Sequence, residues 1–352
     1  MNRRLDSGSL SDSVNDQLTT GIGTVARFGE RRARNLGVVA VFVAGFSVYA
    51  IAIDGLKLYA QRIVDALSNG FVYAAMALAL VLIYKATGVI NFAQGNMAMF
   101  GTFLAYVLIV EQGMPVALGI VAAMAISAFG AAIIERLFVR PFDPGNHLAI
   151  TIVTLAWFLI LAALAGVIWA YDLKAFPTPF PGAKGDFVDI GGVRLRYENV
   201  GIWITVLVVV GLVTLLLKRT KIGLAFRSVS SNLESSRLVG IHVGRTLQFG
   251  WALAAAVGTL AGCLIARVTY LDPNFMGRVL VYSFAAATLG GLDSLGGAVA
   301  GGVLIGLFET MIAGYVDFIG SELALGGAFA VIVLILLVKP SGLFGSTRVE
   351  RV

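Results

Sequence analysis

The sequence predicts an all-α, polytopic membrane protein with short or broken helices near its centre. The chain of 352 residues is 58% hydrophobic and only 13% charged, whereas a soluble domain carries roughly 25% charged residues. Long uncharged runs also recur along the chain, and most reach the roughly 17–25 residues that a helix needs to cross a bilayer. A transmembrane β-barrel would show alternating segments of about ten residues instead. We therefore set the β-barrel architecture aside.

The uncharged runs give the expected helices in order. They cover residues 36–53, 66–84, 86–110, 112–134, 144–171, 199–217, 246–266, 279–292, 294–308 and 323–338. The last three are shorter, and Asp293 alone separates the first two of these. We expect eight to ten membrane-spanning helices, with ten preferred, in a transmembrane domain at residues 36–340. A short tail follows at residues 341–352.

The charges between the runs predict the topology. Basic residues near the ends of spans favour the cytoplasmic side, and arginines precede the first run. Residues 1–35 are rich in Ser, Asn, Asp and Arg, which predicts a disordered basic cytoplasmic tail. Ten spans then place both termini and the basic loop 218–245 inside, and the charge-balanced loop 172–198 outside. Arg62 and Arg267 fall outside and disagree with this scheme.

The outer loop contains a hairpin signal, because two short apolar stretches flank Gly191 and Gly192. Such a hairpin could contact an external partner or decorate the surface.

Polar residues in the third run are the first candidates for a functional site. Asn91, Gln94 and Asn96, with Gly95, lie in residues 86–110, which hold no charged residue. In hydrocarbon an unpaired polar group costs several kcal/mol, so such residues usually face the protein interior or a water-filled cavity. We therefore expect these four residues to line a transport pathway.

A second glycine-rich segment, residues 287–302, lies in the other half of the chain. Gly290, Gly291, Gly296 and Gly297 flank Asp293, which indicates a turn or a helix break. Interrupted hydrophobic segments in corresponding halves are typical of transporters with a central site.

Later positions of this segment allow a packing interpretation, because Gly297 and Gly301, then Gly302 and Gly306, have the spacing that lets helices approach closely. Glu309 follows in apolar sequence. Its ionised form costs at least roughly 2.5 kcal/mol there unless it is paired or wet. We expect it to have a partner or water, and both a place in the pathway and a structural pairing stay open.

The basic loop 218–245 contains a short predicted helix at about residues 232–239. Ser231 and Glu234 have capping-box spacing, and Gly240 is a natural stop. Apolar residues in this water-exposed segment favour docking on a partner subunit over packing on the chain itself. The candidate docking residues are Ser231, Asn232, Leu233, Glu234, Arg237, Leu238, Gly240 and Ile241.

Together these motifs resemble the permease subunits of branched-chain amino-acid ABC importers, of the LivH type. The resemblance covers about residues 69–344 and is carried by the segments 69–78, 88–95, 135–141, 219–241, 287–302 and 340–345. It implies a type II importer fold in a bacterial cytoplasmic (inner) membrane. The implied partners are a second, LivM-like permease or another copy of the chain, two ATPase subunits and an external solute-binding protein. The segment 231–241 would then be the coupling loop that docks on the ATPase.

The resemblance implies a transport subunit and not an enzyme. The chain lacks the G-x-x-x-x-G-K-[ST] phosphate loop, so we expect ATP to be used by the partner subunits and no cofactor to be bound here. The single cysteine, Cys263, lies in an apolar run and has no companion ligand. No metal site is expected.

Family members commonly carry Asn-Phe-Ala-His-Gly-Glu where this chain has Gln94 and Asn96. Neutral amides bind a zwitterion or an uncharged amide about equally well. Branched-chain amino acids are the expected solutes, while urea, short amides and other amino acids remain open. The alternatives of another class are an ion-coupled secondary transporter or channel that uses Glu309 and Asp293, and a membrane scaffold without transport.

Overall fold

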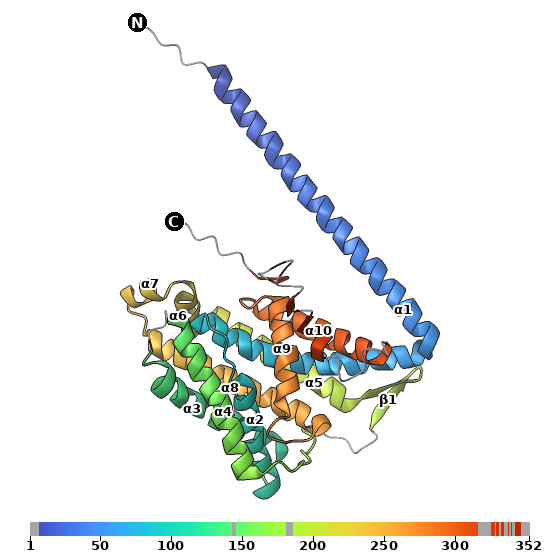
Figure 1. Cartoon of the computed structure of the whole chain (residues 1–352), viewed down its shortest axis with the longest axis vertical. Helices are drawn as coiled ribbons and strands as arrows, with labels where there is room; N and C mark the ends of the chain where they lie inside the picture. Colours follow the sequence, from blue (N-terminus) through green and yellow to red (C-terminus); the bar gives the residue numbers. More distant parts are fainter. Residues whose placement is uncertain are drawn as a thin grey trace. The chain divides into compact units, whose positions relative to one another are not determined.

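A computed structural model shows an all-α protein with a small hairpin in the part of the chain that it describes (Figure 1). It describes residues 7–142, 146–180 and 186–315, and of the remainder 325–327, 329–330, 332–333, 337, 339 and 342–345. For residues 7–43 the description is limited to the backbone. The chain divides into two compact units, residues 1–59 and 60–352.

The elements follow one another along the chain. They are α1 (Ser7–Thr87), α2 (Gln94–Tyr106), the π-helix η1 (Val107–Glu111), α3 (Val116–Ile134), the π-helix η2 (Glu135–Val139), α4 (His147–Trp169), β1 (Phe187–Ile190), β2 (Val193–Arg196), α5 (Tyr197–Arg219), α6 (Lys221–Ser231), α7 (Leu233–Leu238), α8 (Val243–Thr269), α9 (Met276–Gly290) and α10 (Leu295–Tyr315).

The first unit consists of the early part of α1. Its backbone is helical from Ser7, and residues 1–6 lie outside the described part. The disordered state expected for residues 1–35 stays a prediction. Gly55 interrupts α1 with φ 75° and ψ 160°, a backbone conformation that glycine adopts without a steric penalty.

The second unit holds the hydrophobic core. In α8, 78% of the most apolar stretch is buried, against 22% in α3, α4 and α5. A helix that is apolar all round yet exposed in a single chain indicates a lipid or partner environment. We conclude that α8 lies at the centre and that α3, α4 and α5 are peripheral.

The apolar runs became helices, as the sequence predicts. Six helices of the described part are long and apolar enough to cross a membrane, and α9 is a shorter apolar helix. The runs 36–53 and 66–84 both lie in α1. The run 86–110 begins with the last two residues of α1, continues through the non-helical residues 88–93 and becomes helical again at Gln94. Half of the run 323–338 lies outside the described residues. The chain is therefore a multi-pass membrane protein with short central helices.

Segments that the topology assigns to one side of the membrane do meet in the structure. On the predicted cytoplasmic side, the Nζ of Lys85 donates a hydrogen bond to the carbonyl oxygen of Asp293 at 2.7 Å. On the same side, Arg140 Nη2 donates to the carbonyl oxygen of Gly244 at 2.8 Å. These bonds join loops that are far apart in sequence, so the alternation of spans is consistent within the fold.

On the predicted outer side, the backbones of Lys174 and Leu271 exchange two hydrogen bonds. The two basic residues that disagreed with the charge scheme have local partners here. Arg267 forms an ion pair with Glu198, and the guanidinium of Arg62 lies 4.6 Å from the centre of the Tyr315 ring. Local pairing offsets the cost of these basic residues at an outer membrane surface.

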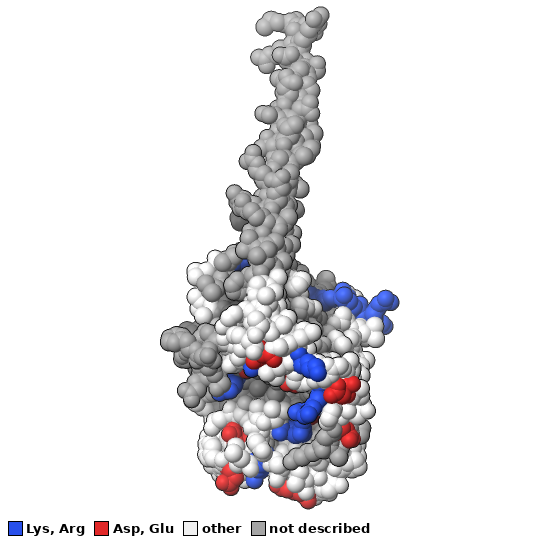
Figure 2. All heavy atoms as spheres, turned by 90° about the vertical axis from the view of Figure 1, so that its right-hand side faces the viewer, with Lys and Arg blue, Asp and Glu red and all other residues white. Residues whose placement is uncertain are grey.

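The hairpin expected in the outer loop is present. β1 and β2 pair in antiparallel register, with Phe187 opposite Arg196, and Gly191 and Gly192 take the positive φ values of the turn. On the molecular face shown in Figure 2, basic and acidic residues lie beside one another and uncharged residues cover most of the remaining surface. Such a mixed surface does not predict a strongly charged partner.

Candidate functional site

The polar residues before α2 are buried and hydrogen-bonded within the chain. The Asn91 side chain is 1% exposed, and its Oδ1 accepts a hydrogen bond from the backbone N–H of Ala93 at 3.0 Å. The fully buried Gln94 donates from Nε2 to the carbonyl oxygen of Ala254 in α8 at 3.0 Å. Asn91 and Gln94 also contact each other at 3.4 Å. These amides fix the start of α2 against the central helix.

The next two residues of this segment join α2 to other helices. Asn96, 7% exposed, donates from Nδ2 to the carbonyl oxygen of Phe158 in α4. A Cβ on Gly95 would lie 3.0 Å from a side-chain carbon of Leu280 in α9. None of the predicted pathway amides lines either of the two cavities described below. Their contact with solute stays a prediction, and it requires α2 to move.

The glycine-rich segment forms a helix break followed by a tight helix pair. α9 ends at Gly290, Gly291 has φ 103°, and α10 begins at Leu295. Gly290 and Gly297 face each other so closely that a Cβ on either would meet the other's backbone. Gly296 has open space around it. The four-residue turn with Asp293 is therefore compact, and α9 packs directly against α10 (Figure 1).

Two glycines of α10 also let it approach α1. A Cβ on Gly302 would meet the backbone of Ala74, and one on Gly306 would meet the backbone of Gly70. The pairs Gly302/Gly306 and Gly70/Ala74 share the four-residue spacing of closely packed membrane helices. The packing interpretation of these glycines agrees with the geometry.

Glu309 has a partner in the membrane-spanning region. The hydroxyl of Tyr73 in α1 donates to Glu309 Oε2 at 2.9 Å. The ring of Tyr73 lies 5.1 Å from the ring of Tyr282 in α9. Three helices, α1, α9 and α10, thus bring one carboxylate and two phenols together.

The predicted short helix of the basic loop is α7, but its N-cap differs from the expected one. The Asn232 side-chain oxygen accepts from the backbone N–H of Ser235 at 2.8 Å. Ser231 is the last residue of α6. Asn232 is the N-cap because its backbone has the extended φ and ψ of a capping residue. Gly240, with φ 82°, follows the helix as expected.

The end of α7 presents apolar side chains to solvent. Leu238 is 88% exposed and Val239 is 73% exposed. The charged residues Glu234 and Arg237 are also exposed, while Leu233 and Ile241 are partly buried. The exposed tip of α7 is therefore available for a partner, and Leu233 faces inward.

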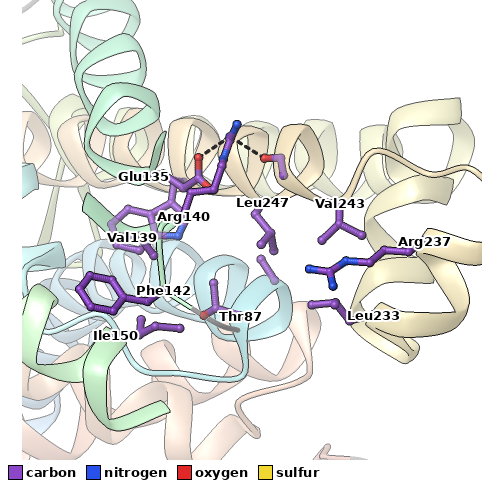
Figure 3. A pocket seen from close by; sticks show the side chains of 13 residues that line it. Thr87, Glu135, Val139, Arg140, Phe142, Ile150, Leu233, Arg237, Val243 and Leu247 are labelled. Carbon is purple, nitrogen blue, oxygen red and sulfur yellow. Dashed lines mark hydrogen bonds and ion pairs between the residues drawn. The ribbon is translucent and has the colours of Figure 1, made fainter. Parts of the chain in front are cut away.

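Beneath α7 lies a cavity of about 300 Å³. Leu233 and Arg237 reach into it from α7, and Arg140 faces it from the opposite side (Figure 3). Trp251 of α8 lines it as well, is 1% exposed, and its indole N–H has no hydrogen-bond partner in the described part of the chain. Residues of both α7 and α8 thus line the cavity.

An ion pair anchors the wall of this cavity. Arg140 donates to Glu135 at 2.6 Å and 3.3 Å, and it also bonds Gly244 and Gln248 at the start of α8. The π-helical turn η2 makes the pair possible, since the Arg140 N–H bonds the Glu135 carbonyl oxygen at 2.7 Å. The i→i+5 repeat places residues five apart on the same face.

A second cavity, of about 680 Å³, lies beside the first. It is lined by the end of α1, the start of α4, the end of α6 and the turn between α9 and α10. Lys85, His147, Arg227 and Asp293 contribute polar groups. Of these residues, His147 at the start of α4 is exposed.

Comparison with known proteins identifies the family. Residues 62–338 match the family described as branched-chain amino acid transport system, permease component. The chain belongs to this permease family. The permease resemblance stated from the motifs is thereby confirmed, and so is the fold class that it implies.

Several permeases of this family are similar over most of their length. The high-affinity branched-chain amino acid transport system permease protein BraD of Pseudomonas aeruginosa is 30% identical over 308 residues, covering 84% of this chain and 98% of BraD. The corresponding LivH of Escherichia coli K12 is 27% identical over 306 residues, with the same coverage. A probable LivH of Methanocaldococcus jannaschii is 31% identical over 280 residues, 77% of this chain and 87% of that permease.

The permease structure adds residues that the sequence did not single out. Tyr73 and Tyr282 flank Glu309, while Arg140 and Trp251 line the cavity under α7. Arg140 lies in the motif 135–141, which was one sign of its importance. Tyr73 likewise lies in the motif 69–78. Tyr282 carried no comparable signal, because apolar helices often contain tyrosine.

Proposed function

We propose that the chain is the permease subunit of an ABC importer that moves branched-chain amino acids into the cell. The single observation that carries the proposal is the family match over residues 62–338. BraD and LivH, which match over 98% of their own length, are named for branched-chain amino acid transport, and this supports the solute class. The proposed setting is the bacterial cytoplasmic membrane, with both termini inside.

The proposed assembly contains a second permease, LivM-like or a further copy, two ATPase subunits and an external solute-binding protein. Membership of a permease family supports a need for energising and solute-delivering partners. ATP would be used by the ATPases, so this chain makes and breaks no covalent bond. Its part is alternating access, in which the two permeases open to the outside and then to the inside.

The loop with α7 is the proposed coupling element. Leu238 and Val239 are apolar, exposed and part of a basic, water-facing loop, and exposed apolar groups of this kind mark interaction sites. The cavity behind Leu233 gives α7 space to shift toward Trp251. Such a movement of α7 would displace the central helix α8.

A physical connection leads from α8 to the predicted pathway segment. Trp251 lies one turn before Ala254, whose carbonyl oxygen holds Gln94. A displacement of α8 would therefore pull on the start of α2, where Asn91, Gln94 and Asn96 are buried. In this proposal ATP-driven movement of α7 exposes these amides to the solute path between the two permeases.

The proposal is tested with the complete importer reconstituted in proteoliposomes, with ATP and the binding protein supplied. We expect saturable uptake of labelled leucine, isoleucine and valine, and no competition by urea. Uptake of urea or another solute with no uptake of branched-chain amino acids would contradict the solute assignment.

A further inference from the structure

The position of Glu309 in the membrane calls for a polar environment. Glu309 lies about 14 residues into α10, or ~21 Å along its axis at ~1.5 Å per residue. It is half-buried, and its helix neighbours Leu304 and Phe308 are 44% and 36% exposed. A carboxylate facing lipid at this depth is strongly disfavoured. This face of α10 therefore meets protein or a water-filled path in the assembled importer.

The groups around Glu309 leave hydrogen-bonding capacity unused. Tyr73 donates to Oε2, and it is the only hydrogen-bond partner of Glu309 among the described residues. Tyr282 is 1% exposed, yet its hydroxyl has no hydrogen-bond partner within the described part of the chain. Buried hydroxyls usually find a partner. Among the described residues, Glu309 Oε1 and the Tyr282 hydroxyl therefore remain available for a further hydrogen-bond partner.

A cation also belongs to this cluster. Arg278 is exposed on α9, one helical turn before Tyr282. The cluster thus combines an acidic group and two phenols with a basic group one helical turn away along α9.

We infer that Glu309, Tyr73 and Tyr282 form a binding site for the ammonium group of the transported amino acid, and that Arg278 attracts its carboxylate. This inference rests on the proposed function. An ammonium group supplies three N–H donors, which Glu309 Oε1 and the Tyr282 oxygen can accept. A zwitterion matches both charges of the cluster, whereas urea, which has neither charge, does not.

The test uses the complete importer in proteoliposomes with leucine as the probe, supplied on saturating binding protein. Glu309→Gln removes the charge and keeps the shape, and Tyr282→Phe removes only the hydroxyl. Glu111→Gln, at the exposed end of η1, is the matched control. Leucine uptake, ATP hydrolysis and subunit assembly are measured together.

We expect Glu309→Gln to lower the leucine uptake rate about tenfold or more, since a hydrogen bond to a charged group is lost. Tyr282→Phe should lower it about threefold or more, and Glu309→Asp should restore part of the rate. ATP hydrolysis and assembly should persist, and Glu111→Gln should transport normally. A loss of uptake with hydrolysis intact is a change that a merely structural role would not produce.

Unchanged uptake in both Glu309→Gln and Tyr282→Phe would overturn the inference. Loss of assembly in Glu309→Gln combined with normal uptake in Tyr282→Phe would also overturn it, because Glu309 would then be a structural contact to the second permease. Failure of the unsubstituted importer to move leucine at all would instead contradict the proposed function, so the two failures are distinguishable.

Discussion

Replacing Arg140 by methionine should destabilise the chain through the carboxylate that it leaves behind. Glu135 is 1% exposed and pairs with Arg140 at 2.6 Å. Removing one partner of a buried ion pair costs about 3–5 kcal/mol, because the remaining charge is buried without compensation. The Arg140 side chain is 33% exposed, so water can compensate part of the loss. We therefore expect the free energy of unfolding to fall by about 3 kcal/mol, at the lower end of that range.

The assay is thermal unfolding of the purified chain in detergent. A loss of this size lowers Tm by about 4 °C, because the entropy of unfolding grows with chain length and this chain has 352 residues. The double substitution Glu135→Met with Arg140→Met should recover most of the stability, since no buried charge remains. Arg136→Met, at an exposed neighbouring position, should change Tm little. The reasoning would be refuted by an Arg140→Met variant as stable as the parent, or by a double variant no better than the single one.

Three further predictions concern packing, coupling and the pathway. Gly306→Ala should destabilise the chain by about 1–3 kcal/mol because its Cβ would meet the Gly70 backbone, while Gly296→Ala, in open space, should leave thermal unfolding unchanged. Leu238→Ser should weaken ATPase binding in a pull-down without lowering Tm, and equal weakening by Ile222→Ser on the exposed face of α6 would argue against a specific role of the α7 tip. Asn91→Leu should reduce solute uptake while the subunits still assemble, and normal uptake would remove Asn91 from the pathway.

Much of the helical architecture could be predicted from the sequence, because a bilayer requires long uncharged runs and the runs are visible. The same reasoning required a partner for Glu309, and Tyr73 provides it. Which residue would be that partner could not be predicted. The choice depends on the close approach of α10 to α1, a tertiary feature with only the glycine spacing as a sign.

Other features depend on local geometry that sequence patterns do not specify. Glu135 and Arg140 would lie on different faces of an ordinary α-helix, and only the π-helical turn brings them together. The cap of α7 was expected at Ser231 and lies at Asn232. Both residue types are good caps, so the sequence does not distinguish them, and the extended backbone of Asn232 decides the position. The pathway amides are another case, since an uncharged run predicts their burial but not that they would bond within the chain.

The central claim is that ATP hydrolysis by the partner subunits drives the permease through α7. The energy source of leucine uptake tests this claim most directly. Uptake into membrane vesicles is compared after inactivating the partner ATPase and, separately, after dissipating the proton gradient while ATP is supplied. The account predicts that uptake stops when the ATPase is inactive and continues when only the proton gradient is lost. Uptake that survives loss of the ATPase, or that stops with the proton gradient alone, would contradict it and favour an ion-coupled transporter.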